Sequence, residues 1–312
     1  MKISVIIPVY NAEKYVSQAV ESALQFEEVY EVILVEDNSP DNALQVCRRL
    51  TEKYSRVKLY QHYDKGNHGA GATRNLGIAM ADGEFIAFLD ADDYYLSNRF
   101  DAEKELFKDP KVEGVYGALG TRYYSEKARS DYFKLFADRL STVHDKHHPK
   151  DVFAGQLGMK GSFGLMHLDT LTIRKDALQK VGSFFKKELR LHQDTEFLFR
   201  LSFYTDLYPG MIDRAIAIRG IHENNRITQV DSRKINPATT RVLLWKEIND
   251  WAQNENTIPQ EMKLHIRRMH RSYEIALAPT LKKWAMITKY LFTDYRSIRS
   301  GLYNINFRKD LF

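Results

Sequence analysis

The segment FIAFLDADD, at residues 85–93, places three carboxylates directly after five apolar residues. A short continuous apolar run of this kind is typical of a strand that is buried on both faces of a parallel sheet. Asp90, Asp92 and Asp93 would therefore leave the core together, and they would repel one another without a cation. Carboxylate oxygens suit Mg²⁺ or Mn²⁺, so the segment predicts a metal site at the end of a buried strand.

On the amino-terminal side of this strand, short apolar runs alternate with helical patterns. The predicted strands are 3–7, 32–35, 57–61 and 85–89. Apolar residues recur at helical spacing over 15–24, so one face of that helix can cover the sheet. Further helices are predicted over 41–54, with Ser39 as N-cap and Pro40 in the first turn, and over 70–81, closed by Gly83. Strands that alternate with helices indicate an α/β fold with a mostly parallel sheet.

Length, charge and cysteine content narrow the class of protein. A chain of 312 residues can hold one large domain with an appendage, and its single cysteine, Cys47, is interpreted as a packed thiol. The net charge of +5 suits anionic partners such as nucleotides, lipid surfaces or nucleic acid. The apolar start is short and lacks a cleavage site, and no run approaches eighteen apolar residues. We therefore expect a soluble or peripheral protein rather than an integral membrane protein.

The predicted strands run into polar side chains at their carboxyl ends, where open α/β sheets bind ligands. The first strand ends near Tyr10, the second near Asp37 and the fourth near Asp90. Each residue has a plainer interpretation, since Asp37 could begin a turn and Tyr10 could be a packing residue. Together they would bring an aromatic ring and several carboxylates to one edge of the sheet.

Several segments together resemble family 2 glycosyltransferases of the GT-A fold. The matching segments are VIIPVYN at 5–11, ILVEDNS at 33–39, GAGATRN at 69–75, FLDADD at 88–93, GSFF at 182–185, QDTEF at 193–197 and IHEN at 221–224. They occur in the family's order over residues 3–228. The resemblance implies a Rossmann-like GT-A domain over 1–228, with a nucleotide-binding half at 1–93 and an acceptor half at 94–228. Residues 229–312, mainly helical in pattern, are expected to form a separate extension.

The same resemblance implies which residues bind the donor. Pro8 and Tyr10 are expected to line the donor site. Tyr10 would pack on the nucleobase, and Asp37 would accept its imide N–H. Arg74 is expected to meet the donor sugar or diphosphate at the start of a helix, although a surface cation is the plainer alternative. Asp90, in the Asp-x-Asp pattern, would support the sugar or ribose.

The resemblance also implies the residues of the metal and the reaction. Asp92 is expected to be the chief ligand of Mn²⁺ or Mg²⁺, and His222 is expected to complete the metal or diphosphate site. Asp93 is expected to support these ligands without contacting the cation itself. Asp194 matches the general base of inverting members, which removes the proton of the acceptor hydroxyl. The preceding Gln193 departs from the acidic residue usual in the family, and Asp194 could instead be the N-cap of a helix.

The expected activity is metal-dependent, inverting transfer of a hexosyl or N-acetylhexosaminyl group. The donor would be a nucleotide-sugar, with UDP-sugar favoured, and the acceptor a saccharide or lipid-linked hydroxyl in polysaccharide biosynthesis. We expect a cytoplasmic protein and no nucleic-acid partner; the sequence leaves the oligomeric state open. Aromatic and basic residues interleave in the carboxyl-terminal extension, which fits peripheral contact with an anionic membrane, a partner surface or an ordinary helical cap.

Two alternatives from other classes stay open. One is an NAD(P)-dependent oxidoreductase, suggested by the Gly-Ala-Gly at 69–71. A dinucleotide fingerprint belongs at the first strand-to-helix turn, however, and that turn contains no glycine. The other is a noncatalytic nucleotide-sugar-binding, scaffold or nucleic-acid-binding protein that uses the basic helices. Whether nucleotide-sugar binding survives deletion of those helices would distinguish this noncatalytic class from an enzyme.

Overall fold

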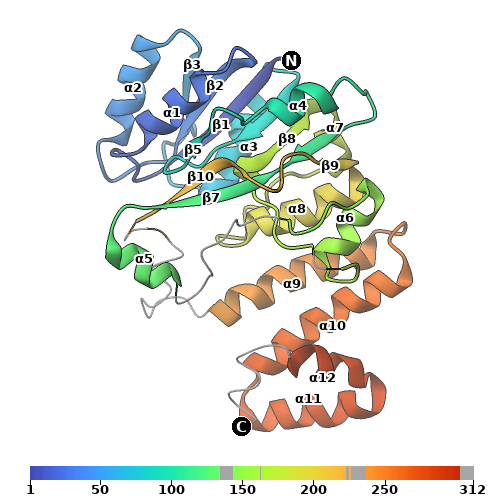
Figure 1. The fold of residues 1–312 in the computed structure, drawn as a ribbon. Coiled ribbons are helices and arrows are strands. Elements are labelled where there is room, and N and C mark those ends of the chain that lie inside the picture. Colours follow the sequence, from blue (N-terminus) through green and yellow to red (C-terminus); the bar gives the residue numbers. More distant parts are fainter. Residues whose placement is uncertain (134–142, 162, 223–224, 226–236, 303–312) are drawn as a thin grey trace. The chain divides into compact units, whose positions relative to one another are not determined.

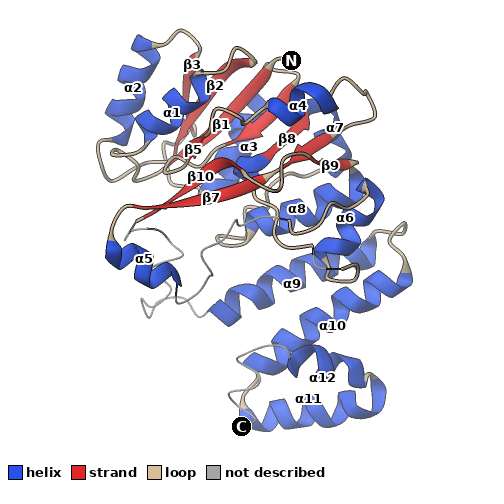
Figure 2. Cartoon of the chain, viewed as in Figure 1, coloured by secondary structure: helices blue, strands red, loops and turns tan. Residues whose placement is uncertain are grey.

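The computed structural model describes residues 1–133, 143–161, 163–222, 225 and 237–302 (Figure 1). The chain divides into two compact units, Met1–Gln229 and Val230–Phe312. The first contains two sheets and their covering helices, and the second is helical where it is described (Figure 2).

A seven-stranded sheet forms the centre of the first unit. Its strands, in spatial order, are β3 (Val57–Gln61), β2 (Val29–Glu36), β1 (Ile3–Val9), β4 (Phe85–Phe88), β8 (Leu171–Arg174), β6 (Gly114–Tyr116) and β9 (Leu207–Pro209). The four strands from β3 to β4 run parallel, β8 is antiparallel to both of its neighbours, and β9 is parallel to β6. All four predicted strands are present, and the prediction of a mostly parallel α/β sheet with flanking helices is confirmed.

Helices cover both faces of this sheet. The described helices of the unit are α1 (Val16–Leu24), α2 (Ala43–Lys53), α3 (Ala70–Met80), α4 (Asp101–Leu106), α5 (Glu126–Phe133), α6 (Pro149–Gln156), α7 (Lys175–Leu178) and α8 (Gln193–Tyr204), with 3-10 turns at Leu168–Thr170 and Gln179–Val181. Alternate residues of β1 serve two cores: Val5 and Ile7 pack with α1 and α2, whereas Ile6 packs with α3 and α8. The Cys47 thiol is buried in the first core, and burial raises its pKa to about 12, which confirms the packed thiol.

A three-stranded sheet joins distant parts of the chain. Here β10 (Ala215–Ile221) lies between β5 (Tyr94–Tyr95), to which it is antiparallel, and β7 (Ala118–Tyr123), to which it is parallel. Gly220 of β10 passes so close to the turn after β4 that a Cβ there would lie 2.3 Å from the carbonyl oxygen of Asp92. The absence of a side chain at residue 220 thus allows the end of β10 to meet the carboxylate segment.

The predicted N-cap of the second helix is wrong. Helix α2 begins at Ala43, with Asn42 in the N-cap position. The Ser39 hydroxyl instead accepts the amide N–H of Asn11 at 3.3 Å, and Asp41 accepts the amide N–H of Ala43 at 3.1 Å. Ser39 is held by the end of β1 across the sheet edge, and this tertiary contact overrides its capping tendency.

The prediction that Gly83 closes the third helix is wrong. Helix α3 ends at Met80, and Ala81 is already extended at the C-cap. The amide of Gly83 donates to the Ser4 hydroxyl at 2.9 Å, and a Cβ on Gly83 would lie 2.6 Å from that oxygen. The glycine therefore serves the close approach of the chain to β1 rather than the helix end.

The second unit contains four described helices, α9 (Pro237–Asn254), α10 (Gln260–Leu277), α11 (Thr280–Thr293) and α12 (Tyr295–Leu302). A small core forms where Ile275 and Ala276 of α10 meet Ile287 of α11. Asp294, between α11 and α12, accepts from Arg268 at 2.9 Å and from Arg271 at 3.1 Å. Among the described residues, no helix combines the length and the apolar character that a membrane crossing requires.

Candidate active site

The carboxyl ends of β1, β2 and β4 lie next to one another. Val9 pairs with Glu36, and the amide of Asp37 donates to the Val9 carbonyl at 2.9 Å. On the other side of β1, the amide of Leu89 donates to the carbonyl of Ile6 at 3.1 Å. The predicted polar residues that follow these strands therefore share one edge of the sheet.

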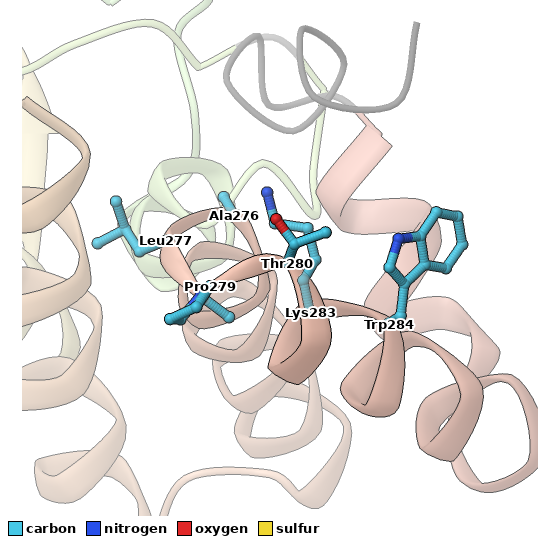
Figure 3. A pocket seen from close by; sticks show the side chains of 7 residues that line it. Ala276, Leu277, Pro279, Thr280, Lys283 and Trp284 are labelled. Atoms are coloured by element: carbon cyan, nitrogen blue, oxygen red, sulfur yellow. The ribbon is translucent and has the colours of Figure 1, made fainter.

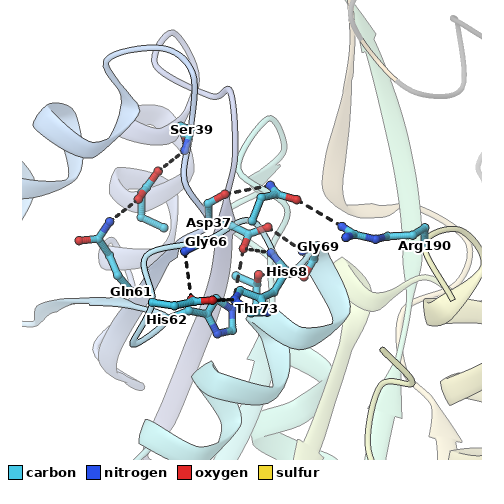
Figure 4. A network of polar contacts seen from close by, with 12 residues as sticks. Asp37, Ser39, Gln61, His62, Gly66, His68, Gly69, Thr73 and Arg190 are labelled. Carbon is cyan, nitrogen blue, oxygen red and sulfur yellow. Dashed lines mark hydrogen bonds and ion pairs between the residues drawn. The ribbon is translucent and has the colours of Figure 1, made fainter. Parts of the chain in front are cut away.

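Asp37 is buried at this edge and organises the loop before α3. Its two carboxylate oxygens accept the amide N–H groups of His68 at 2.7 Å and of Gly69 at 2.8 Å (Figure 4). The side chain of Asn67 donates to the Asp37 carbonyl at 2.9 Å and accepts from Arg190 at 3.2 Å. Gly69 has a φ of +82°, a backbone conformation that glycine adopts without strain. Asp37, whose carboxylate is predicted to accept the N–H of the base, therefore also holds the loop that precedes α3.

Tyr10 and Pro8 lie on β1 and directly after it. Pro8 is half-buried and pairs with Val35 of β2, while Tyr10 is 47% exposed. The Tyr10 ring is available at the strand end for a flat ligand.

Arg74 and Asp90 form an ion pair. Arg74 Nη2 lies 2.5 Å from Asp90 Oδ1, and its side chain is only 7% exposed, which rules out the plain surface cation. Burial alone would lower the pKa of Arg74, but Asp90 and Asp194 raise it above its ordinary value. Burial would likewise raise the pKa of Asp90, yet Arg74 and His167 hold it below its ordinary value. Both groups are therefore charged at neutral pH.

Asp92 meets residues that follow β10. Asp92 Oδ2 lies 3.1 Å from His222 Nε2 and accepts from Asn225 Nδ2 at 3.0 Å. The His222 ring also stacks on Tyr15, with centroids 4.6 Å apart and an interplanar angle of 13°. The structure thus brings together the two predicted metal ligands from positions 130 residues apart.

Asp93 points into the protein, toward a second buried carboxyl group. Asp93 Oδ1 accepts the amide N–H of Gly220 at 2.8 Å, and Asp169 Oδ1 accepts the amide N–H of Asp90 at 3.0 Å. Burial and then Asp169 raise the pKa of Asp93 well above its ordinary value. Burial and then Asp90 raise the pKa of Asp169 to about 7. Burial therefore favours the protonated form of Asp93 at neutral pH, and Asp169 holds the start of the Asp90–Asp93 turn through the Asp90 amide.

His167 adds a second group of atoms that could hold a cation. One ligand atom each from Asp90, His167 and Asp169 lies within 4.8 Å of the others. However, His167 Nδ1 accepts the amide N–H of Asp169 at 3.3 Å, and its Nε2 contacts the Arg219 guanidinium. Burial and then Arg219 lower the pKa of His167 well below its ordinary value. Arg219 on one side and Arg74 on the other disfavour a divalent cation here compared with Asp92 and His222.

Asp169→Asn should change how the stability of the protein depends on pH. The pKa of Asp169 is raised from 3.8 to about 7, so its contribution to stability is present below pH 4 and is lost as pH rises through about 7. Asparagine resembles the protonated acid. We expect the free energies of unfolding of the variant and the wild type to coincide only below about pH 4. The excess stability of the variant should then be on the order of 1–3 kcal/mol larger at pH 8.5 than at pH 5.

Urea titrations in a chelator at the two pH values would measure this difference. The control is Asp213→Asn, at an exposed aspartate. Equal free energies of unfolding for wild type and Asp169→Asn at pH 8.5 would contradict the raised pKa of the buried Asp169 carboxyl.

Asp194 lies in the first turn of α8. That helix begins at Gln193, and His192 occupies the N-cap position with φ of +61°, so the alternative of Asp194 as N-cap is wrong. Asp194 Oδ1 accepts the amide N–H of Thr195 at 2.8 Å. The charge of Asp194 also raises the pKa of Arg74. Its carboxylate therefore lies close enough to the ion pair of Arg74 and Asp90 to interact with it electrostatically.

Sequence reasoning missed five residues of this region: Asn225, His167, Asp169, Arg219 and Arg190. The sequence carries a partial signal for two of them, because His167 and Asp169 stand immediately before the apolar strand β8. Polar residues before a strand ordinarily lie away from the ligand edge of a parallel sheet. Since β8 is antiparallel to β4, its beginning lies at the edge where β4 ends.

The sheet order, the carboxylate turn after β4 and the partner residues after β10 define the GT-A class of nucleotide-sugar-binding folds. The family model described as "Glycosyl transferase family 2" matches residues 4–166, which is more than half of the chain. The chain belongs to glycosyltransferase family 2.

Curated relatives carry names of the same kind. TarS of Staphylococcus aureus, a poly(ribitol-phosphate) beta-N-acetylglucosaminyltransferase, is 27% identical over 69% of this chain and 35% of its own length. The minor teichoic acid biosynthesis protein GgaB of Bacillus subtilis is 37% identical over 62% of this chain and 20% of its own length. The chain therefore spans less than half of the length of either relative.

Solved structures share the fold at low sequence identity. The crystal structure of TarS residues 1–349 with UDP-GlcNAc has a TM-score of 0.64 and 19% identity, covering 92% of this chain and 78% of that one. The mannosyltransferase PcManGT from Pyrobaculum calidifontis, in complex with GDP-Man and Mn²⁺, has a TM-score of 0.55 and 15% identity, covering 98% of this chain and 85% of that one.

Proposed function

We propose that this protein is a metal-dependent, inverting glycosyltransferase that moves a hexosyl or N-acetylhexosaminyl group from a UDP-sugar to a hydroxyl of a saccharide or lipid-linked acceptor. The proposal rests mainly on the contact of Asp92 with His222, next to the ion pair that the buried Arg74 forms with Asp90. Tyr10 and Asp37 lie at the ends of the neighbouring strands, so a nucleotide, a diphosphate and a sugar can be accommodated in sequence along the edge. Membership in the family removes the oxidoreductase alternative.

The residues present fit a divalent cation at Asp92 and His222. The side chain of Asp92 is 31% exposed, so an ion can reach it from solvent, and the Nε2 atom of His222 lies 3.1 Å from its carboxylate. Carboxylate oxygen with imidazole nitrogen suits Mn²⁺, and carboxylate oxygen with water suits Mg²⁺. When bound, the cation would stabilise the charge of the departing diphosphate.

The chain's own groups account for binding and proton transfer. Arg74 is kept charged and nearly immobile by Asp90, so its guanidinium can orient a diphosphate or sugar with little loss of side-chain entropy. Asp194 accepts the proton of the acceptor hydroxyl as that oxygen attacks the anomeric carbon, a contribution of about 10² to 10⁴ in rate. The ring of Tyr10 buries one face of the base, and Asp37 fixes the loop that faces it.

The acceptor class is supported by what the relatives are named for. TarS is named as a poly(ribitol-phosphate) beta-N-acetylglucosaminyltransferase, GgaB as a minor teichoic acid biosynthesis protein and PcManGT as a mannosyltransferase. For this chain we propose an acceptor of similar chemistry, a hydroxyl on a growing surface polysaccharide or on its lipid-linked precursor. The reaction would take place on the cytoplasmic side, where nucleotide-sugars are available.

A panel of nucleotide-sugars tests the proposal through thermal stability, because a ligand that binds only the folded state raises the unfolding temperature. We expect UDP-sugars to raise it more than GDP-sugars or NAD(P)H do, and more in Mn²⁺ than in a chelator. Release of UDP on addition of an acceptor polymer then distinguishes an enzyme from a noncatalytic binding protein. A panel without any Mn²⁺-dependent nucleotide-sugar shift would overturn the proposed function.

Tyr10→Ala should weaken UDP binding about tenfold or more even in a chelator, because base stacking contributes about 1–3 kcal/mol. The matched control is Tyr30→Ala, since Tyr30 is also 47% exposed but lies at the beginning of β2. Titration calorimetry with UDP gives both affinities. Tyr10 is a cleaner probe than Asp37, whose loss would leave two buried amides without acceptors. Equal affinity in the two tyrosine variants would place the base elsewhere.

A further inference from the structure

Helix α11 presents two different faces. Ile287 is buried, and Met286 and Tyr290 pack with it against α10 and α12. The opposite face is apolar as well, yet it is exposed: its members, with their exposed fractions, are Leu281 (89%), Trp284 (55%), Leu291 (56%), Phe292 (86%) and, just beyond the helix, Tyr295 (58%). Their spacing of three, four or seven residues places them in one stripe. Contiguous exposed apolar side chains of this size mark an interaction surface.

The charges around this stripe have one sign. The segment from residue 280 to 302 contains five lysines and arginines and a single acid, Asp294. That acid is 11% exposed and is paired inside the unit with Arg268 and Arg271. Lys282 and Lys289 are exposed on α11, and Arg296 is exposed on α12. The surface that flanks the apolar stripe is therefore cationic.

A hollow of about 380 Å³ lies where α10 passes into α11 (Figure 3). Residues 276–280, Lys283 and Trp284 line it. The exposed stripe, which begins at Leu281 and Trp284, thus adjoins an indentation rather than a flat surface.

We propose that the exposed stripe of α11 attaches this protein to the surface of an anionic lipid bilayer. Aromatic and aliphatic side chains can enter the boundary between headgroups and acyl chains while the flanking cations remain with the anionic headgroups. A second copy of the chain fits less well, because contact through the same face would bring like charges together. The attachment goes beyond the proposed transfer reaction and does not require it.

Sedimentation of the full chain with vesicles tests the attachment. At low salt the protein should pellet with phosphatidylcholine vesicles that contain phosphatidylglycerol, and much less with phosphatidylcholine alone. Lys282→Gln with Lys289→Gln should weaken this binding about thirtyfold, since each cation near an anionic surface contributes about fivefold. The matched control is Arg48→Gln with Lys111→Gln, two exposed cations of the first unit.

Separate variants test the apolar side chains of the stripe. Phe292→Ser should weaken binding to the anionic vesicles at least tenfold, whereas Tyr63→Ser, which removes a fully exposed ring in the first unit, should not. Vesicles should also shift the tryptophan emission of the wild type to the blue, and Trp284→Phe should lose that shift while still binding.

Three results would overturn the attachment: no pelleting of the wild type, equal pelleting with neutral and anionic vesicles, or unchanged binding in both the Lys282/Lys289 and Phe292 variants. Concentration-dependent dimerisation that Phe292→Ser abolishes, without vesicle binding, would assign the face to a second copy. Binding of UDP by the same variants, measured without vesicles, keeps this outcome separate from the proposed transferase activity.

Discussion

Asp92→Asn should abolish the Mn²⁺-dependent part of UDP-sugar binding and reduce turnover by at least a hundredfold. The substitution removes an anionic oxygen ligand but keeps the volume and one acceptor oxygen. His222 Nε2 and Asn225 Nδ2, which lie 3.1 and 3.0 Å from Asp92 Oδ2, can still donate to that oxygen. The turn after β4 should therefore keep its structure, and removing even a supporting partner of a metal ligand typically lowers metal affinity 10- to 100-fold.

Calorimetric titration of UDP in Mn²⁺ and in a chelator measures this effect. Asp101→Asn is a suitable control, because it removes an exposed carboxylate at the start of α4. We expect the wild type and the control to bind more tightly in Mn²⁺, and Asp92→Asn to bind equally in both solutions. If Asp92→Asn retained the full Mn²⁺ enhancement, the alternative group of Asp90, His167 and Asp169 would become the candidate cation site.

Asp194→Asn should lower turnover by about a hundredfold or more while the affinities for UDP and Mn²⁺ stay within about twofold. Asparagine cannot take the proton of an acceptor hydroxyl, but its carbonyl oxygen can still accept the amide N–H of Thr195. Since Asp194 is not the N-cap of α8, the substitution leaves the cap unchanged. The loss should therefore appear in kcat rather than in donor binding or stability.

Helix α7 provides a close structural control. Asp176 also lies in a first turn and accepts the amide N–H of the next residue, Ala177, at 2.8 Å. Asp176→Asn should keep near-normal turnover, because it changes the same local hydrogen bond away from the proposed site. Near-normal turnover in Asp194→Asn would remove Asp194 from the mechanism. Parallel loss of UDP binding and turnover would show instead that the residue supports the architecture of the site.

The sequence predicts the first half of the sheet well for a physical reason. Strands β1, β2 and β4 are parallel and largely buried, so each contains an uninterrupted apolar run, whereas β3 lies at the edge of the sheet and is mostly only partly buried. Their carboxyl ends must then lie at one edge, which is why Asp37, Asp90 and Asp92 could be grouped in advance. The predicted ends of the helices were less accurate, because Ser39 and Gly83 are held by contacts with β1 that local patterns do not contain.

The other half of the site depends on pairing between distant segments. Nothing near residue 169 in the sequence indicates that β8 runs antiparallel, and this direction places Asp169 beneath Asp90. Likewise, only the insertion of β10 between β5 and β7 explains how Asn225 reaches Asp92. His222 was predicted from the family resemblance, because periodicity and spacing alone do not indicate a role for it.

The contact between Gly220 and Asp93 closes a loop of 127 residues, and the one between His222 and Asp92 a loop of 130. Contacts across such separations form late in folding, because the chain entropy lost on closure is recovered only when the surrounding strands have paired. The edge formed by β1 and β2 can form from the first 70 residues, whereas the contacts of Asp92 and Asp93 with residues 220 and 222 require β10. During synthesis and refolding, the proposed base-binding edge would therefore form before the proposed cation site, and binding of Mn²⁺, if the proposal holds, would mark the molecules whose first unit has finished folding.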